Sequence, residues 1–528
     1  MGKSAHNGSL FMPVLFPKDN PRSILSFCMI REGVLEKFES YARFHHEFSL
    51  REFRDSYCPG EELGPLLVAL LPTLSRLSLG WRGTGRDYWI FGISHRKPLI
   101  LSPSFALSLS GQIRQGLESE KLQELTQHYI EYKTGKSWDD PLVLQRIRTG
   151  IMQQKGQYWS EKDSRRIGYR KGYAVLAYLA YHAPVYFTQF QHAFLMLIKD
   201  GLIPNSARVL DIGSGPGVVS LAISAISRAI PAFSAELFAL ERSEEFQECY
   251  RYFISQFPDN ESGITAYPVI NGDLRDIKTL LLPSSVDLIV LQNVTNELVQ
   301  ETPEQRSEYL KQASRILAPK GCMIIIEPAE LRNSTELRKM VQAATGPDLH
   351  VHSPCTSIGK RRCAAEQCWS FVQKPSIPPT RLMQALAGDH DAFRFLNTDI
   401  KFSYAVLVKD DRTRHCFSPE SVSSFTRLSS LSRMLGRKVR VIGALMSGDL
   451  GDRRNHVFLF CDGTSRQSVY AILPHFHVSP MNQELLTLPY SSILEITDAH
   501  VRFNKKYSSW NIFLTRNSCV TPVCRASD

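Results

Sequence analysis

The most regular hydrophobic pattern of the chain runs from position 208 to about 374, where short apolar runs alternate with amphipathic segments. The apolar runs have the length of buried strands, and the segments between them repeat apolar residues at helical spacing. We expect strands at Arg208–Ile212, Leu237–Leu240, Ala266–Ile270, Val286–Leu291 and Cys322–Glu327, with helices such as Val218–Ala229, Glu244–Gln256 and Glu304–Leu317 between them. Strands and helices in turn predict an α/β domain with a parallel sheet covered on both faces.

Beyond position 435 the pattern changes to strands separated by turns rich in glycine and aspartate. We expect strands at Lys438–Leu445, His456–Cys461, Ser468–Leu473, Ile493–Phe503 and Trp510–Thr515. Five strands in a row favour a small barrel, and an OB-like fold is our first interpretation. A meander that extends the central domain is the alternative.

The remaining segments have weaker patterns. Residues 1–140 mix short apolar runs with helical pieces and form an N-terminal region of unknown role, and residues 141–200 form a basic helical lead-in. The central α/β domain is expected at 201–375, a linker or extension at 376–434, and the β-rich domain at 435–528.

Positive charge is concentrated in the lead-in, where positions 141–180 hold eight Arg or Lys residues against two acids. A solvated helical face is the simpler interpretation of such a run. Four interleaved aromatic residues (Tyr158, Trp159, Tyr169 and Tyr173) favour RNA instead, because aromatic rings can stack on bases. The whole chain carries 62 Lys and Arg against 52 Asp and Glu, a net charge of +10. This surplus favours a polyanionic partner, nucleic acid above all.

Hydrophobic residues make up 43% of the 528 positions, which fits a globular protein with sizeable cores. The first residues lack the charged and apolar regions of a signal peptide and the Arg-rich turns of a transit peptide. No apolar run approaches the roughly 18 residues of a membrane span. We therefore expect a cytoplasmic protein without a membrane partner. In a reducing cytoplasm, clustered cysteines more often hold a metal than form disulfides.

A glycine-rich loop, Asp211-Ile-Gly213-Ser-Gly215-Pro-Gly217, follows the first strand of the α/β domain and precedes a helix. Glycines let the backbone approach a ligand closely, and a helix N-terminus offers free N–H groups. This spacing, with an aspartate just before it, is typical of methyltransferases rather than of dinucleotide-binding proteins. The loop therefore predicts a site for S-adenosylmethionine, whose carboxylate needs N–H donors.

Polar residues also follow the next three strands, at the sheet edge where ligands bind in such folds. Glu241 ends the second strand and is expected to accept hydrogen bonds from both ribose hydroxyls. Asp273 follows the third strand and could bind the adenine amine, and Asn293 follows the fourth. Ordinary turns and a surface acid are the alternative interpretation of these positions.

Three cysteines, Cys355, Cys363 and Cys368, lie within fourteen residues. Thiolate sites for zinc and for iron–sulfur clusters usually need four ligands, so a distant fourth is required. We favour Cys461 over Cys416 for this position. Spacing alone does not separate zinc from a [4Fe–4S] cluster, and three free buried thiols remain an alternative. The cations Lys360, Arg361 and Arg362 beside the thiols would favour thiolate.

Five segments over about residues 150–480 resemble a known family. They are Ala177–Pro184 with Tyr186, the loop Asp211–Gly217, Asn296-Glu-Leu298, Glu327-Pro328, and Pro354-Cys355…Cys368…Phe371 with His456…Cys461. The family is the methyltransferase-like one associated with the small ribosomal subunit of bacteria, archaea and mitochondria. The resemblance implies a Rossmann-type class I methyltransferase domain that acts on small-subunit ribosomal RNA or its assembly. It also implies a [4Fe–4S] cluster on Cys355, Cys363, Cys368 and Cys461, although Trp369 follows the third cysteine where family members tend to have Trp before it.

Catalytic residues are not evident. Enzymes that methylate amino groups of nucleic acids often carry an Asn/Asp-Pro-Pro-aromatic turn after the fourth strand, where this chain has Asn293-Val294-Thr295. Methylation at carbon 5 of cytosine needs a cysteine nucleophile, but Cys355 is better explained as a metal ligand. Asn296 and Glu297 are only weak candidates. Two hypotheses stay open: an enzyme that methylates small-subunit ribosomal RNA, which we favour slightly, and a non-catalytic assembly or RNA-binding factor. The basic charge and the barrel disfavour a small-molecule or protein methyltransferase.

Overall fold

The computed structural model describes residues 32–45, 47–77, 79–84, 87–92, 97–159, 172–257, 263–283, 285–355, 358, 363–388, 392–415, 417 and 425–526. The chain divides into two compact units. One combines Met1–Arg96 with Arg275–Val286, and the other combines Lys97–Leu274 with Asp287–Asp528. None of the described helices has the length and apolar character needed to cross a bilayer.

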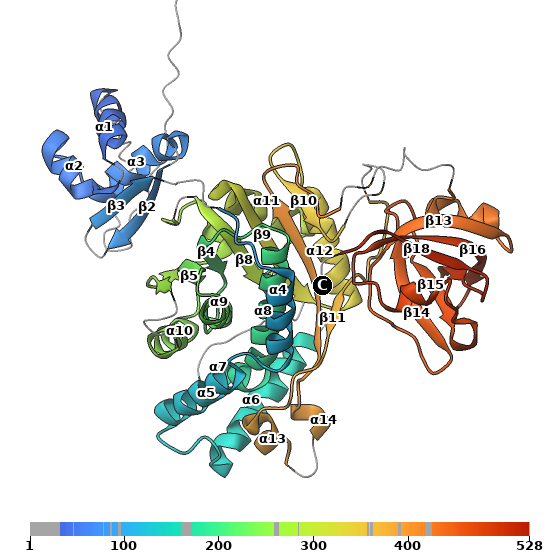
Figure 1. Cartoon of the computed structure of the whole chain (residues 1–528). Helices are drawn as coiled ribbons and strands as arrows, with labels where there is room; N and C mark the ends of the chain where they lie inside the picture. Colours follow the sequence, from blue (N-terminus) through green and yellow to red (C-terminus); the bar gives the residue numbers. More distant parts are fainter. Residues whose placement is uncertain are drawn as a thin grey trace, which may run out of the picture. The chain divides into compact units, whose positions relative to one another are not determined.

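The described residues between positions 32 and 92 form a small α/β unit. Its helices are α1 (Glu32–Phe44), α2 (Leu50–Tyr57) and α3 (Leu63–Arg76), and its antiparallel sheet has the order β1 (Glu47–Ser49), β3 (Asp87–Gly92), β2 (Leu79–Thr84) (blue in Figure 1). The Ser49 side chain caps α2 by accepting a hydrogen bond from the amide of Glu52. Phe38, Phe53 and Leu67 lie in a separate core under these elements.

Between position 97 and the central sheet the described residues form five helices, the last three of which lie in the stretch 141–200 that was expected to be helical. They are α4 (Pro103–Arg114), α5 (Ser119–Thr134), α6 (Pro141–Trp159), α7 (Ala174–Tyr181) and α8 (Ala183–Lys199). Two cations of the basic run have structural roles here, because Arg148 donates to the carbonyls of Ala385 and Leu386 and Lys155 donates to that of Arg394. Residues 160–171, which hold five of the eight cations and Tyr169, lie outside the described residues, as do the side chains of Tyr158 and Trp159.

The central sheet is mixed, which corrects the expectation of a wholly parallel sheet. Its strands are β4 (Ser206–Ile212), β5 (Ser234–Glu241), β6 (Ile264–Ala266), β7 (Ile270–Asn271), β8 (Val286–Gln292), β9 (Leu317–Pro328), β10 (His350–Ser353), β11 (Val372–Lys374) and β12 (Ile400–Val408). The order is β10-β12-β9-β8-β4-β5-β6. β4 pairs in parallel with β5 and β8, whereas β12 is antiparallel to both β9 and β10. The segment expected as an extension at 376–434 therefore supplies an internal strand of this sheet.

Both faces of the sheet are covered, as expected, because consecutive residues of β8 and β9 are buried. The covering helices after β4 include α9 (Val218–Ala229) and α10 (Glu244–Gln256), whose bounds match the prediction, and α11 (Pro303–Ser314) and α12 (Leu331–Ala344). Two further helices, α13 (Arg381–Ala387) and α14 (Ala392–Phe395), lie away from the sheet, and α13 packs on α5, α6 and α7. The predicted strand Ala266–Ile270 is wrong: β6 ends at Ala266 and β7 begins at Ile270. Pro268 lies between them and has no N–H to donate to a neighbouring strand.

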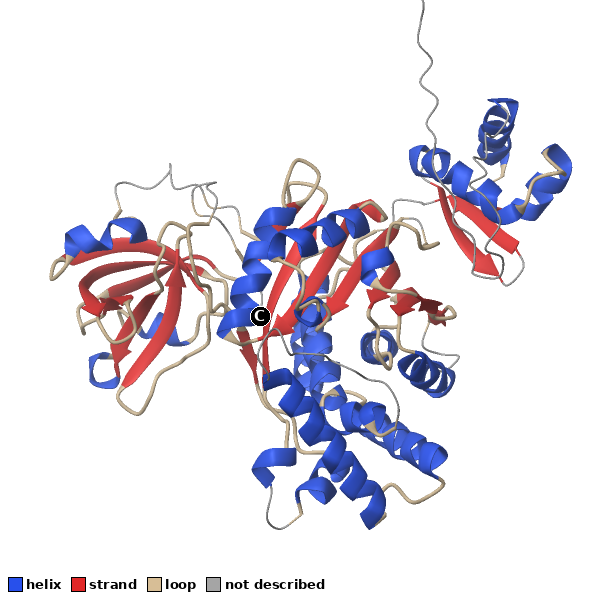
Figure 2. Cartoon of the chain, turned by 180° about the vertical axis from the view of Figure 1, so that it is seen from behind, coloured by secondary structure: helices blue, strands red, loops and turns tan. Residues whose placement is uncertain are grey.

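The C-terminal part is a barrel in which five strands form a closed circuit (red strands at the left of Figure 2). Its strands are β13 (Lys438–Leu445), β14 (Asn455–Cys461), β15 (Val469–Pro474), β16 (Ile493–Asn504) and β17 (Ser509–Phe513), and a sixth strand, β18 (Cys519–Cys524), pairs with β16. The circuit β13-β14-β15-β17-β16 closes through the pairing of β13 with β16, and only β15 and β17 pair in parallel. The five predicted strands are confirmed, and β18 was missed.

Candidate functional site

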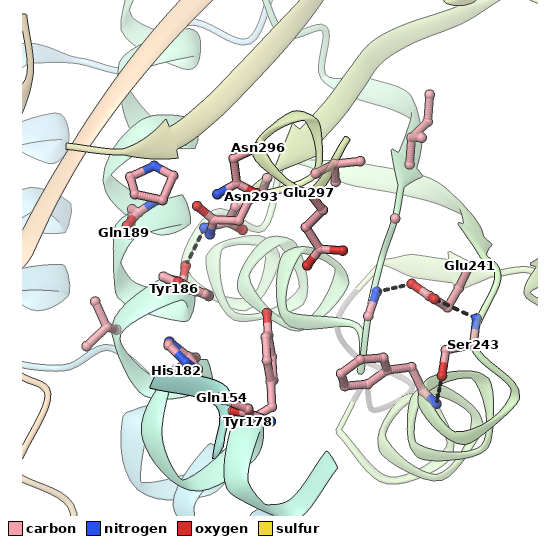
Figure 3. A pocket seen from close by; sticks show the side chains of 18 of the residues that line it. Gln154, Tyr178, His182, Tyr186, Gln189, Glu241, Ser243, Asn293, Asn296 and Glu297 are labelled. Atoms are coloured by element: carbon pink, nitrogen blue, oxygen red, sulfur yellow. Dashed lines mark hydrogen bonds between the residues drawn. The ribbon is translucent and has the colours of Figure 1, made fainter. Parts of the chain in front are cut away.

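A cavity of about 570 Å³ lies at the carboxyl ends of β4, β5 and β8 (Figure 3). β5 and β8 flank β4 on opposite sides, so the chain order reverses there, and ligands of open α/β sheets bind at such a point. The walls come from the loops after these strands, from α7 and α8, and from segments near residues 328 and 399. Among the predicted cofactor residues, Gly213, Gly215, Glu241, Asp273 and Asn293 line the cavity.

Steric contacts explain two of the loop glycines. Gly213 has φ +70°, and a β-carbon there would lie 2.7 Å from Val294 Cγ2. Gly217 has φ +93°, and a β-carbon there would lie 2.8 Å from the Tyr250 ring. Gly217 precedes α9 and does not line the cavity. The lack of a side chain there lets Tyr250, which lies on α10, pack against the loop.

The amides of the loop already have acceptors within the protein. Gly213 and Ser214 donate to the carbonyl of Leu240 at 2.7 and 3.1 Å, and Gly215 donates to Glu241 Oε2 at 2.8 Å. We expected these N–H groups to bind the carboxylate of a ligand, but acceptors on β5 already occupy them. What the loop offers the cavity is close approach of a backbone without side chains at Gly213 and Gly215.

Glu241 is buried at the end of β5 and faces the cavity (Figure 3). One carboxylate oxygen accepts from the Gly215 amide and the other from the Ser243 amide, each at 2.8 Å. Burial raises the pKa of this carboxyl, and the two hydrogen bonds oppose that effect. Because each carboxylate oxygen can accept more than one hydrogen bond, Glu241 can still receive two hydroxyl groups of a ligand.

Asp211 lies behind the loop rather than in the cavity wall. It is 2% exposed and does not line the cavity, and its Oδ2 has no hydrogen-bond partner among the described residues. Burial, with Glu241 nearby, holds its pKa well above the ordinary value. The structure thus places Asp211 as a neighbour of Glu241 and not as a direct cavity contact.

Arg242 connects two acids in the cavity wall. Its guanidinium lies 2.9 Å from Asp273 and 3.6 Å from Glu297. The arginine side chain is about half exposed, so these ion pairs contribute little to stability. A ligand amine at Asp273 would have to share that carboxylate with Arg242.

Asn293 has a backbone conformation that non-glycine residues rarely adopt, with φ +58°. Its amide donates to the carbonyl of Ile326 at 2.8 Å, which fixes the turn after β8. The next residues are held by Glu327, which accepts from the amide and hydroxyl of Thr295 at 2.9 and 2.6 Å. Burial raises the pKa of Glu327 to about 7. Glu327 lies outside the cavity wall and positions the turn that carries Asn293 and Asn296.

The wall opposite Glu241 comes mainly from α7 and α8, and its chemistry was largely missed in the sequence. His182 and Tyr186 stack with ring centroids 5.4 Å apart and planes at 22°. Burial, together with Lys155, lowers the pKa of His182 to about 4, so its imidazole is neutral near pH 7. The spacing of four residues between the two rings is a signal that could have indicated a shared helical face.

The four predicted ligand cysteines influence one another electrostatically. Burial raises the pKa of Cys368 to about 11, and Cys355 and Cys363 add to this while Arg338 opposes it. Burial also raises the pKa of Cys461, with Cys363 and Cys368 contributing. Within the described residues, however, no three His, Cys, Asp or Glu side chains are arranged so that they could hold a metal ion. Residues 359–362 and Cys416 lie outside the described part of the chain.

Two family models match the chain. The model described as mitochondrial small ribosomal subunit Rsm22 matches residues 172–435. A second, described as the C-terminal domain of a domain of unknown function (DUF8157), matches residues 429–523, which include the five strands of the barrel. No curated protein matches the chain.

Several solved methyltransferases are similar at low identity. A S-adenosylmethionine-dependent methyltransferase from Methanosarcina mazei is 20% identical with a TM-score of 0.20, over 24% of this chain and 55% of that one. A putative class I enzyme from Listeria monocytogenes is 9% identical with a TM-score of 0.30, over 58% and 91% of the two chains. A TehB-like methyltransferase from Corynebacterium glutamicum is 16% identical with a TM-score of 0.23, over 42% and 88%. The chain spans only about half to two thirds of the Methanosarcina mazei structure and of two further similar ones, from Leishmania major and Aquifex aeolicus.

Proposed function

Because this chain belongs to the family described as mitochondrial small ribosomal subunit Rsm22, whose model matches half of its 528 residues, we propose that it is a methyltransferase-like protein that binds S-adenosylmethionine and acts on small-subunit ribosomal RNA. The observation that carries the proposal is the cavity between the glycine loop and Glu241 at the carboxyl edge of the sheet. The family description supports the ribosomal partner, and the net charge of +10 supports a polyanionic one.

The cavity fits the cofactor by the chemistry of its residues. The ribose hydroxyls would donate to Glu241, whose carboxylate is fixed by two backbone amides. Gly215 leaves room beside it, because a β-carbon there would meet no atom within 4 Å, and Asp273 with Arg242 would border the adenine. When bound, S-adenosylmethionine supplies an electrophilic methyl group, and the protein contributes position and the exclusion of water.

We favour an enzyme because polar groups surround the cavity on the side away from Glu241, where an acceptor for the methyl group would lie (Figure 3). The neutral His182 could accept a proton there, although a pKa of about 4 makes it a weak base. The second candidate is a non-catalytic assembly factor. The acids of the cavity wall favour this candidate because they are engaged within the protein. Glu241 accepts from two backbone amides, and Asp273 and Glu297 lie beside Arg242, so none is set up as a catalytic base.

For the barrel we propose an OB-like fold. The closed circuit of five strands supports it, and barrels of this class bind oligonucleotides on one face. In this interpretation the barrel supplies RNA affinity and the cavity supplies cofactor binding.

We also propose that Cys355, Cys363, Cys368 and Cys461 hold a [4Fe–4S] cluster, with zinc as the alternative. Four cysteine thiols are the donor set that either group requires, and the mutual effects on their pKa values support their closeness. Ligation would need these side chains to rearrange, because they do not form a metal-binding group as described. Anaerobic purification followed by iron, sulfide and zinc analysis distinguishes the two.

We also propose a cytoplasmic location. The description of the family as mitochondrial makes mitochondria the alternative location. Fractionation of cells that produce the tagged chain decides between them.

Transfer of labelled methyl groups tests the function itself. Small ribosomal subunits from cells lacking this chain are incubated with the purified protein and methyl-labelled S-adenosylmethionine. Label in the RNA is the result expected of the enzyme. Cofactor binding and subunit association without label would favour the non-catalytic factor, and no association with the subunit would overturn the ribosomal proposal.

A further inference from the structure

Three carboxamide side chains gather at the end of the cavity away from Glu241 (Figure 3). Gln189 comes from α8, Asn293 from the turn after β8, and Asn296 from the short helix η2 (Thr295–Glu297). Gln189 is 2% exposed and Asn296 is 9% exposed. Gln189 and Asn296 are thus buried and Asn293 is half-buried, and all three form part of the cavity wall.

Each carboxamide has a buried polar atom that lacks a protein partner. Gln189 Nε2, Asn293 Nδ2 and Asn296 Oδ1 make no hydrogen bond to any described residue. Proteins rarely leave buried polar atoms unpaired, because each loses its hydrogen bonds to water without replacement. Three such atoms in one cavity wall indicate a ligand that completes them.

An aromatic surface borders the same end of the cavity. His182 and Tyr186 form the stacked pair described above, and Tyr178 lies with its ring centroid 5.5 Å from that of His182. Lys155 also lines the cavity near His182, but because His182 is neutral near pH 7 the ring surface itself carries no positive charge. It suits the face of an uncharged planar ring better than it suits a phosphate.

We propose that this end of the cavity binds a nucleobase extruded from RNA, with the edge of the base on Gln189, Asn293 and Asn296 and its face on the His182–Tyr186 pair. This inference rests on the proposed function, since it places the base next to the cofactor. Enzymes that act on bases take them out of the stack and read them by hydrogen bonds to their edges and by stacking. A carboxamide offers both a donor and an acceptor, and the edges of the bases carry both kinds of group as well.

The proposal predicts that the site selects one base. Three carboxamides in one arrangement satisfy one pattern of donors and acceptors, so a base with a different pattern leaves polar groups unpaired and binds more weakly. The probes are the 5′-monophosphates of adenosine, guanosine, cytidine and uridine. Each is titrated into the full chain saturated with S-adenosylhomocysteine, so that no probe can occupy the cofactor end. We expect the dissociation constants to span at least tenfold.

Gln189→Leu and Asn296→Leu remove the hydrogen-bonding groups without leaving a void. Each variant should bind the preferred nucleotide at least tenfold more weakly, and the dissociation constants of the four nucleotides should differ less than in the unaltered chain. The matched control is Gln191→Leu on the same helix, where the carboxamide is buried, donates to the carbonyl of Leu117 and does not line the cavity. Any loss of stability from removing a buried carboxamide should appear in the control as well.

Affinity for S-adenosylhomocysteine separates this proposal from the one on which it rests. We expect that affinity to change less than threefold in Gln189→Leu and Asn296→Leu. Saturation with the cofactor product but no nucleotide binding, or equal affinity for all four nucleotides, would overturn the base site alone. If the variants lost affinity for S-adenosylhomocysteine and for the nucleotide to the same extent, these carboxamides would belong to the cofactor site and the base site would be overturned. No binding of the cofactor product by the unaltered chain would overturn the proposed function.

Discussion

Glu241 accepts a hydrogen bond from the amide of Gly215 at 2.8 Å, so the end of β5 is joined directly to the glycine loop that follows β4. The second hydrogen bond, from the Ser243 amide, holds the other carboxylate oxygen. This fixed carboxylate at the edge of the cavity is the feature on which the proposed cofactor site depends.

Replacing the carboxylate tests that role. Glu241→Gln should weaken binding of S-adenosylhomocysteine by roughly 10- to 150-fold, because hydrogen bonds to a charged group contribute about 1.5–3 kcal/mol. Isothermal titration calorimetry measures the change. Glu248→Gln is the control, since Glu248 is a surface acid on α10 that pairs with Lys133 and does not line the cavity. Equal affinity in the two variants would remove Glu241 from the site.

The glycine loop gives a steric prediction. Gly213→Ala places a methyl group 2.7 Å from Val294, in a backbone conformation with φ +70°. Gly135→Ala is the matched control, because Gly135 has φ +64° with no atom within 4 Å of the added carbon. The control should lose only the roughly 1–2 kcal/mol of a left-handed alanine. Gly213→Ala should lose more, and its melting temperature should fall below that of Gly135→Ala; the reverse order would contradict the packing described.

Glu327 predicts a pH effect on stability. Burial raises its pKa to about 7 in the folded protein from an ordinary value of 4.5, so the folded chain binds this proton more tightly than the unfolded chain. The stabilising effect is complete below about pH 4.5 and is lost as the pH rises through 7. Glu327→Gln should therefore gain stability relative to the unaltered chain between pH 5 and pH 8, by up to about 3 kcal/mol. Melting temperatures at both pH values measure it, and a constant difference would show that Glu327 does not titrate in this range.

The cysteine proposal predicts a specific loss of metal. Cys461→Ser should lower the iron, or the zinc, bound per chain after anaerobic purification, because a four-thiolate site would lose a ligand. Cys519→Ser is the control, since Cys519 lies on β18 and is not among the four predicted ligands. If both variants kept the metal content of the unaltered chain, Cys461 would not be a ligand.

Local patterns predicted most of the parallel part of the fold, and they singled out several residues that line the cavity, although not Asp211 or Gly217 among those expected to do so. The bounds of α9 and α10, the five barrel strands, and Gly213 and Glu241 in the cavity wall all follow from short stretches of sequence. These features depend on hydrophobic spacing and on the order strand, loop, helix, which neighbouring residues determine.

Long-range relationships were not predictable in the same way. β12 lies between β9 and β10, although about seventy residues separate it from β9 along the chain, and antiparallel pairing at that distance leaves no local pattern. The hydrogen bonds of the loop amides also depend on residues distant in sequence. The carbonyl of Leu240 accepts from the amides of Gly213 and Ser214, which are then engaged before a ligand binds. A glutamine such as Gln189 on a buried helix has no sequence signal that separates a cavity residue from a paired core residue.

Titration of the full chain with S-adenosylmethionine tests the central claim most directly. Calorimetry should show binding of one cofactor molecule per chain, together with a rise in melting temperature that grows with ligand concentration. Absence of heat and of a thermal shift, for both the cofactor and its demethylated product, would contradict the assignment of this cavity to a methyl donor.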